Sequence, residues 1–178
     1  MVRSILGKLS RRLFASATEM AVPTLSNPID KQQIVERLGK IQPLSPRLWG
    51  RMSVNQMICH LSDSFRVTMG EKPWKTERIS VTPIPLPRWF VKWMALHSPL
   101  KWPHGLKTRP EVDTEHGGTP PTQFERDRAN LLELLERFTR RPPEFEWQPH
   151  PMFGTMSDRD WMRWGYLHMD HHLRQFGK

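Results

Sequence analysis

Three histidines lie within five positions near the carboxyl end of the chain, at His168, His171 and His172. The surrounding stretch is predicted to be helical, and residues four apart on a helix lie on the same face. His168 and His172 can therefore present two imidazoles to one divalent cation. A third ligand is needed, and the best donor elsewhere in the chain is His60. The sequence thus predicts a metal site at His60, His168 and His172 inside a helical domain.

The pair at spacing four is a weak motif by itself, because eight histidines in 178 residues produce about 0.35 such pairs by chance. Its neighbours strengthen it. Trp161, Trp164 and Gly165 precede the pair at spacings of three and four, and Gln175 follows it, which is the pattern of a buried helix face. Histidines on such a face are either metal ligands or hydrogen-bonded core residues. The residues alone leave both interpretations open.

The composition limits the class of protein. A chain of 178 residues suits one domain with a sizeable core, and no apolar run approaches the roughly 18 residues of a membrane span. The single cysteine, Cys59, excludes an internal disulfide framework and a cysteine-based zinc cluster. The formal net charge of +9 comes without a lysine–arginine block or an aromatic–basic repeat. Nucleic-acid binding is therefore supported by charge alone and is not favoured.

Residues 1–25 are predicted to be a flexible basic leader outside the fold. The first 19 residues carry four basic side chains against one acid, as targeting segments do. The stretch from Ser10 to Phe14 resembles the core of a twin-arginine export signal. An organellar leader fits the composition comparably well, and a translation start at Met20 is a third option. A cytoplasmic location is expected, with export or organelle targeting left open.

Residues 26–178 are predicted to form one all-α domain. Capping signals and apolar periodicity place the main helices over about 28–41, 54–69, 122–139 and 158–176. No stretch shows the period-two alternation of a sheet, so four main helices indicate a four-helix bundle. The helix starts are assigned to Asn27 before Pro28, to capping boxes of Ser53 with Gln56 and Thr122 with Glu125, and to Ser157.

The Pro-rich stretch over residues 71–121 is predicted to carry a short amphipathic helix at residues 87–97. Its tryptophans and phenylalanine are expected to cover the mouth of the bundle, although resting on a membrane surface is an alternative. Residues 101–121 are predicted to be a loop. Four histidines have no predicted partner: His97, His104, His116 and His150. For His150, which precedes Pro151, packing near the metal site is left open.

Most of the chain resembles the DinB-like, or YfiT-like, superfamily of metal-dependent four-helix-bundle proteins. The resemblance covers roughly residues 28–178. It rests on one histidine in the second helix, here His60, and an H-x-x-x-H pair in the last, here His168 and His172, with Gln175 three residues later. The segments 49–57, 150–154 and 171–177 are similar to a branch of that superfamily whose function is unassigned.

This resemblance implies a bundle with a long crossover between the second and third helices, which suits the Pro-rich stretch and its short extra helix. It also implies one divalent ion, with Zn or Ni most suitable, held by His60, His168 and His172. Characterised members include thiol-dependent S-transferases and a maleylpyruvate isomerase. A low-molecular-weight thiol is therefore an expected cofactor.

A site of three neutral imidazoles would leave a coordination position open, which is typical of catalytic centres. Because such an ion can lower the pKa of bound water to about 7 or hold a thiolate, we expect hydrolysis or thiol transfer on a small-molecule substrate. No catalytic residue is assigned, but three residues are candidates for supporting roles: His171, Gln175 and Asp63. Gln175 is expected to bond a bound water or cap the helix. Asp63, one turn after His60, is expected to orient His60, act as a base, or lie solvated at the surface.

Two other functional classes remain open. The bundle could bind metal or a small ligand without turnover, or its basic surface could bind nucleic acid or anionic lipid. A homodimer is also left open.

Overall fold

The computed structural model describes residues 22–73, 86–140 and 145–178. The predicted Ser10–Phe14 signal lies outside these residues. Over the described part the chain is all-helical, with five α-helices and one short 3-10 helix. This part contains no strand, although His150 and Gly154 form an isolated antiparallel bridge. The predicted all-α class is confirmed.

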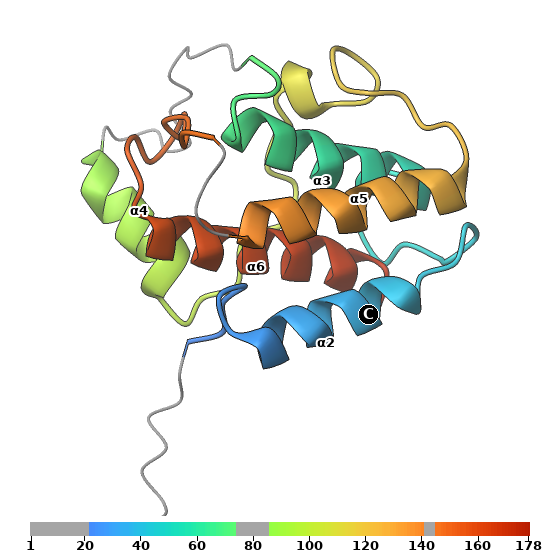
Figure 1. Cartoon of the computed structure of the whole chain (residues 1–178), viewed down its shortest axis with the longest axis horizontal. Helices are drawn as coiled ribbons and strands as arrows, with labels where there is room; N and C mark the ends of the chain where they lie inside the picture. The colour runs from blue at the N-terminus through green and yellow to red at the C-terminus, as the bar shows by residue number, and fades with distance from the viewer. Residues whose placement is uncertain (1–21, 74–85, 141–144) are drawn as a thin grey trace, which may run out of the picture.

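Four longer helices lie side by side along the molecule (Figure 1). They are α2 (Pro28–Gly39), α3 (Val54–Thr68), α5 (Phe124–Thr139) and α6 (Asp158–Gln175). Helix α3 packs against α5, α2 packs against α6, and α3 also contacts α6. The helices that carry His60 and the carboxy-terminal histidines are therefore neighbours.

Two smaller elements cover this arrangement. Helix α4 (Arg88–His97) matches the predicted short helix and contacts α6. The 3-10 helix η1 (Pro110–Val112) interrupts the stretch that was predicted to be a loop, and it lies against α3. Among the described residues, no helix combines the length and apolar character needed to cross a bilayer.

Side-chain hydrogen bonds cap the first turns of three helices, as predicted. The Asn27 side chain accepts a hydrogen bond from the backbone N–H of Ile29 at the start of α2. Ser53 caps α3 through a complete capping box, and Ser157 caps α6 in the same way. These bonds satisfy backbone donors that have no partner within a helix, and so they locate each helix start.

The predicted capping box of Thr122 and Glu125 is wrong. Helix α5 begins one residue later than the box requires, after Gln123, which makes no side-chain capping bond. The backbone N–H and hydroxyl of Thr122 instead donate to the two carboxylate oxygens of Asp127, at 2.8 and 2.7 Å. Because the Asp127 carboxylate accepts both bonds, Thr122 pairs with Asp127 and not with Glu125. Helix α2 also ends earlier than predicted, at Gly39.

The core lies between the helices and is rich in aromatic rings. Trp161, Phe65 and Phe138 are among its largest fully buried side chains. Gly165 allows α6 to approach its neighbours, because a Cβ there would lie 2.7 Å from Leu25 and 2.9 Å from Phe138. Leu25, the last residue of the predicted leader, is itself 2% exposed in this core. The packed part of the chain therefore includes it.

Candidate metal centre

His60 from α3 and two histidines from α6, His168 and His172, come together in the structure. One ligand nitrogen from each ring lies within 4.8 Å of the other two, and the Nε2 atoms of His60 and His168 are 3.1 Å apart. Tetrahedral zinc with bonds of about 2.0–2.1 Å separates its ligand atoms by about 3.4 Å. The cluster therefore has the dimensions of a site for one ion.

The ring of His60 is oriented by a backbone carbonyl. His60 is 6% exposed, and its Nδ1 lies 2.9 Å from the carbonyl oxygen of Val112 in η1. Because a carbonyl can only accept, the proton of the neutral ring sits on Nδ1. The lone pair of Nε2 then faces the other two histidines, as in metal sites whose ligands are held by an outer acceptor.

Gln175 orients His172 by the same principle. Its amide nitrogen donates to the carbonyl of Trp49 at 3.0 Å, and its Oε1 lies 3.0 Å from Nδ1 of His172. The Trp49 carbonyl requires the amide N–H to face it, so Oε1 must accept from His172 and Nε2 of His172 keeps its lone pair. Gly50 leaves room for this amide, since a Cβ there would lie 2.5 Å from the Gln175 nitrogen. Gln175 was predicted to support the site, by bonding a bound water, or to cap the helix; in the structure it bonds Nδ1 of His172.

His168 differs from the other two histidines. It is half-buried, and its Nδ1 has no hydrogen-bond partner among the described residues. Its ring packs 4.8 Å from Trp164, one turn earlier on α6. His168 therefore forms the part of the cluster that is most accessible to solvent.

Burial keeps the three rings uncharged at neutral pH. Desolvation lowers the pKa of His60, and the Val112 carbonyl opposes this only in part. Desolvation also holds the pKa of His168 and of His172 well below the usual value, and repulsion from neighbouring imidazoles adds to it. Neutral imidazoles have the free lone pairs that metal binding requires.

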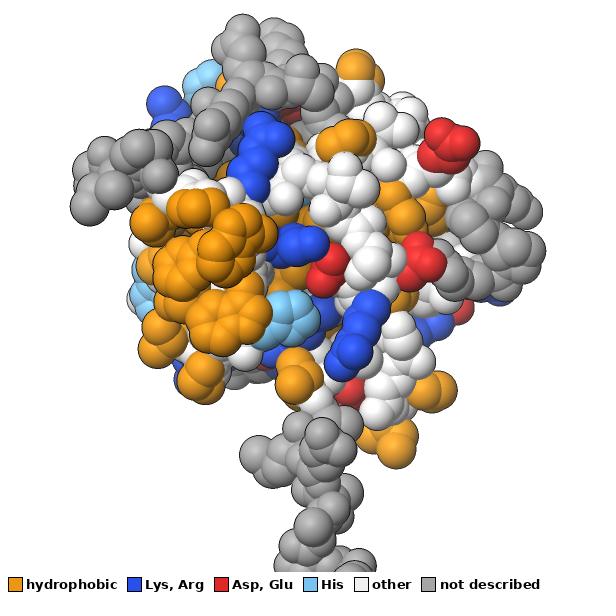
Figure 2. Space-filling view, turned by 90° about the vertical axis from the view of Figure 1, so that its left-hand side faces the viewer, with side chains coloured by type: hydrophobic (Ala, Val, Ile, Leu, Met, Phe, Trp, Pro, Cys, Tyr) orange, Lys and Arg blue, Asp and Glu red, His pale blue; other side chains and the backbone are white. Residues whose placement is uncertain are grey.

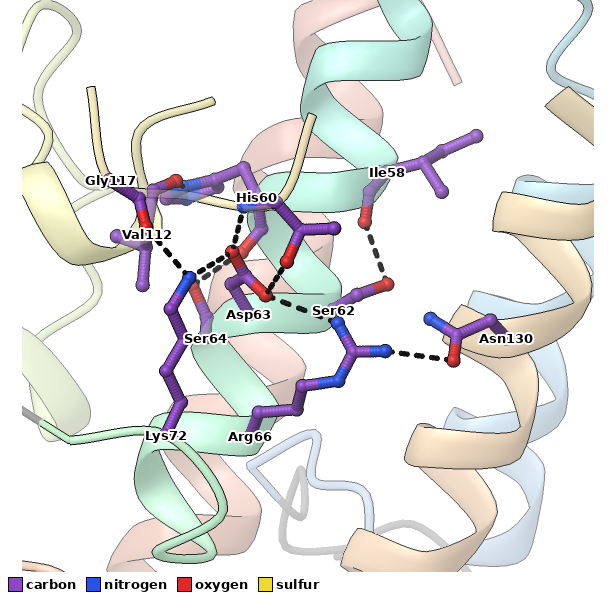
Figure 3. A network of polar contacts seen from close by, with 11 residues as sticks. Ile58, His60, Ser62, Asp63, Ser64, Arg66, Lys72, Val112, Gly117 and Asn130 are labelled. Carbon is purple, nitrogen blue, oxygen red and sulfur yellow. Dashed lines mark hydrogen bonds and ion pairs between the residues drawn. The ribbon is translucent and has the colours of Figure 1, made fainter. Parts of the chain in front are cut away.

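Asp63 is fully buried, so its predicted alternative as a solvated surface carboxylate is wrong. Its oxygens accept hydrogen bonds from Lys72 at 2.7 Å, from Arg66 at 3.1 Å, and from the backbone N–H and hydroxyl of Thr119 at 2.6 and 2.8 Å (Figure 3). Burial alone would raise the pKa of Asp63, but the bonds from Lys72 and Thr119 outweigh it and lower the pKa. The ionised Asp63 side chain therefore links α3 to the segment before α5.

The hydrogen bonds of Asp63 affect His60 only indirectly. Lys72 also donates to the carbonyl of Gly117 at 3.0 Å, so two bonded positions hold the segment over residues 110–119 against α3. The same segment supplies the Val112 carbonyl that accepts from His60 (Figure 3). The acceptor on the His60 ring is thus Val112, whereas Asp63 stabilises the segment that carries it.

His171 lies beside the cluster and contacts a group of rings that we call the aromatic rim: Trp49, Trp102 and His104. It meets Trp49 edge-on at 4.6 Å and lies 6.0 Å from Trp102, while Trp49 stacks on His104 at 4.0 Å. His171 is 8% exposed, and its Nδ1 has no hydrogen-bond partner among the described residues. Burial lowers its pKa to about 4.

The sequence did not predict the aromatic rim. Trp102 also lies 6.0 Å from the ring of His168, so the rim borders the accessible side of the cluster. Its members come from irregular segments, where no periodicity marks a residue as facing the site. The stacking of His104 on Trp49 corrects the expectation that His104 lacks a partner.

The other loop histidines also have neighbours, contrary to expectation. His150 is buried and stacks on Phe153 at 4.2 Å, and burial lowers its pKa to about 3. His116 lies 3.0 Å from a carboxylate oxygen of Asp113, and His97 lies 3.7 Å from Asp160.

Comparison with known proteins adds one finding. A family model described as "Protein of unknown function (DUF1569)" matches residues 30–178, a span that includes the three-histidine cluster and the aromatic rim. A search of curated proteins and a search of solved structures each found no match. Because the model matches most of the sequence, the chain belongs to this DUF1569 family.

Proposed function

We propose that His60, His168 and His172 bind one divalent metal ion, zinc or nickel, within a four-helix bundle of the DinB-like kind formed by α2, α3, α5 and α6. The observation that carries the proposal is the convergence of three imidazole nitrogens within 4.8 Å. Two of the rings are also held through their Nδ1 atoms by acceptors of the protein.

The number of N–H groups on the three histidines argues against a cluster held together by hydrogen bonds alone. Three neutral imidazoles carry three N–H groups and three lone pairs. The N–H groups of His60 and His172 are used by Val112 and Gln175. Only the N–H of His168 remains, and it can serve one lone pair. If Nε2–H of His168 donates to His60, the lone pair on Nε2 of His172 has no donor in the cluster and the buried Nδ1 of His168 has no partner among the described residues. A cation shared by the three rings would accept the lone pair of His172 as well as that of His60.

The three neutral ligands favour a metal site with an open coordination position over a fully coordinated structural site. Among the described residues, no carboxylate or thiolate joins the three-histidine group, so the charge of a dication would stay uncompensated. An anionic group from solution or substrate would therefore complete the site. A divalent ion so held can lower the pKa of a water molecule to about 7 or stabilise a thiolate.

We propose hydrolysis or thiol transfer as the reaction class, with a small electrophilic substrate and, for transfer, a low-molecular-weight thiol. The aromatic rim borders the accessible side of the cluster, and its tryptophans provide an apolar wall for the substrate. His171 is a candidate for a supporting role beside the ion. Its ring lies 5.2 Å from His172, and its lowered pKa of about 4 leaves it neutral at neutral pH.

Elemental analysis of protein from metal-supplemented cells tests the metal site. We expect one equivalent of zinc or nickel in the wild type and in His116→Ala, a control at a side chain that is 64% exposed. His60→Ala, His168→Ala and His172→Ala should each contain none while retaining their helical circular-dichroism spectra. Folded histidine variants with wild-type metal content would show the proposal to be wrong.

A separate assay tests turnover. Consumption of thiol with an electrophile, and hydrolysis of activated esters, are measured with metal-free protein and after addition of Zn or Ni. Activity that requires the metal supports an enzyme. Stoichiometric metal binding without activity on either class of substrate would indicate a metal-binding module instead.

A further inference from the structure

Helix α4 presents large apolar side chains to solvent. Trp89 and Trp93 are 69% and 51% exposed, and the half-buried Phe90 lies between them, 5.8 Å from the first ring and 6.3 Å from the second. Figure 2 looks onto the side of the molecule that α4 forms and shows apolar side chains gathered there. Leu96, in the last turn of the helix, is fully buried and anchors that end of α4 to the core.

The segment that follows α4 also exposes large apolar side chains. Leu100 and Leu106 are 65% and 49% exposed. The segment is held to the helix, because the indole N–H of Trp102 donates to the carbonyl of Ala95 at 2.8 Å. We refer to Trp89, Trp93, Leu100 and Leu106 as the α4 patch.

The surroundings of the α4 patch are basic. Between residues 86 and 110 the sequence contains no Asp or Glu, and Arg88, Lys101 and Lys107 are exposed. Lys92 pairs with Asp160 of α6 at 3.0 Å, so the negative charge of that carboxylate is already compensated. In Figure 2, blue and pale-blue side chains border the orange group.

We propose that the α4 patch docks the protein on an anionic lipid surface. Tryptophan rings are suited to the boundary between headgroups and acyl chains, where an apolar ring and a polar N–H are both satisfied. An amphipathic helix lies in that plane with its apolar side inserted, and nearby lysines and arginines are attracted to lipid phosphates. The absence of acids from residues 86–110 means that this segment adds no repulsion. The proposal does not depend on the metal site.

Vesicle co-sedimentation of the full chain tests this proposal. We expect the wild type to pellet with phosphatidylcholine vesicles that contain phosphatidylserine, and to do so less at high salt or without phosphatidylserine. The double variant Trp89→Ser/Trp93→Ser should bind at least tenfold more weakly, because it removes the inserting rings. Lys101→Glu/Lys107→Glu should lose about fivefold per cation removed.

The control is Ile29→Ser/Leu44→Ser, which removes side chains that are 68% and 93% exposed but lie outside the patch. It should bind as the wild type does. The proposal fails if the wild type stays in the supernatant, or if the tryptophan variant binds as strongly as the control. It also fails if ultracentrifugation shows that the tryptophans mediate self-association without lipid binding.

Discussion

Replacing Gln175 with leucine tests how the structure orients its histidines. Gln175 is 2% exposed, and leucine keeps most of its volume while removing both hydrogen bonds of the amide. Nδ1 of His172 and the carbonyl of Trp49 then lose their partners. We expect His172 to lose its preferred tautomer and ring orientation, so that Nε2 no longer points constantly at the cluster.

The size of the effect follows from the burial of the two bonds. The bond to His172 is fully buried, so its loss should lower the free energy of unfolding of the metal-free protein by about 1–3 kcal/mol. The bond to Trp49 is partly buried, and water can replace it at little cost. Loss of an outer acceptor from a metal-binding histidine weakens metal affinity about 10–100-fold, or about 1.4–2.8 kcal/mol.

The assay is competition for zinc against a chromogenic chelator at neutral pH, together with urea unfolding of the metal-free protein. Gln148→Leu is the matched control, because Gln148 is a half-buried glutamine whose amide donates to the backbone of Glu146. We expect the control to bind zinc with wild-type affinity. If Gln175→Leu binds zinc as tightly as the control, the reasoning about His172 is refuted.

Three further predictions concern the same structure. Gly50→Ala should weaken zinc binding about tenfold, because its backbone φ is +79° and its new Cβ would lie 2.5 Å from the Gln175 amide. Gly154→Ala has a similar φ of +72° but meets its nearest neighbour at 3.6 Å, so it should show only the strain of about 1–2 kcal/mol in urea unfolding. Asp63→Asn should lower the unfolding free energy by about 2–4 kcal/mol at neutral pH. Since the pKa of Asp63 is below its usual 3.8, urea titrations should show this difference shrinking only as the pH falls below that value. Finally, burial lowers the pKa of each clustered histidine below 6.5, so acidification below pH 6.5 should destabilise the metal-free protein, by at most about 1.4 kcal/mol per histidine and pH unit and only until the pH reaches each folded-state pKa; stability that rises on acidification would contradict this.

The sequence predicted the parts of the structure that depend on local periodicity. The i, i+4 spacing places His168 and His172 on one helix face, and the buried-type residues before them identify that face as inward. The class of fold and most helix starts follow from capping residues and apolar spacing. The pairing of α3 with α6 entered as a hypothesis from the need for a third ligand, and the resemblance to a family supported it, because no local pattern specifies which helices pack together.

The remaining parts depend on backbone atoms and irregular segments. The acceptor for His60 is the carbonyl of Val112, and a carbonyl leaves no signal in residue type. The solvated alternative for Asp63 was wrong because Thr119, in the segment predicted to be a loop, donates to both oxygens of its carboxylate. The predicted capping box of Thr122 with Glu125 does not form, because Thr122 donates to both carboxylate oxygens of Asp127.

X-ray absorption spectroscopy of the zinc-loaded protein tests the central claim most directly. We expect three imidazole nitrogens at about 2.0–2.1 Å plus one oxygen or nitrogen ligand in thiol-free buffer, and no bound zinc in His168→Ala. A sulfur ligand in the absence of added thiol, or zinc with the same three-imidazole spectrum in His168→Ala, would contradict the assignment of the ion to these three histidines.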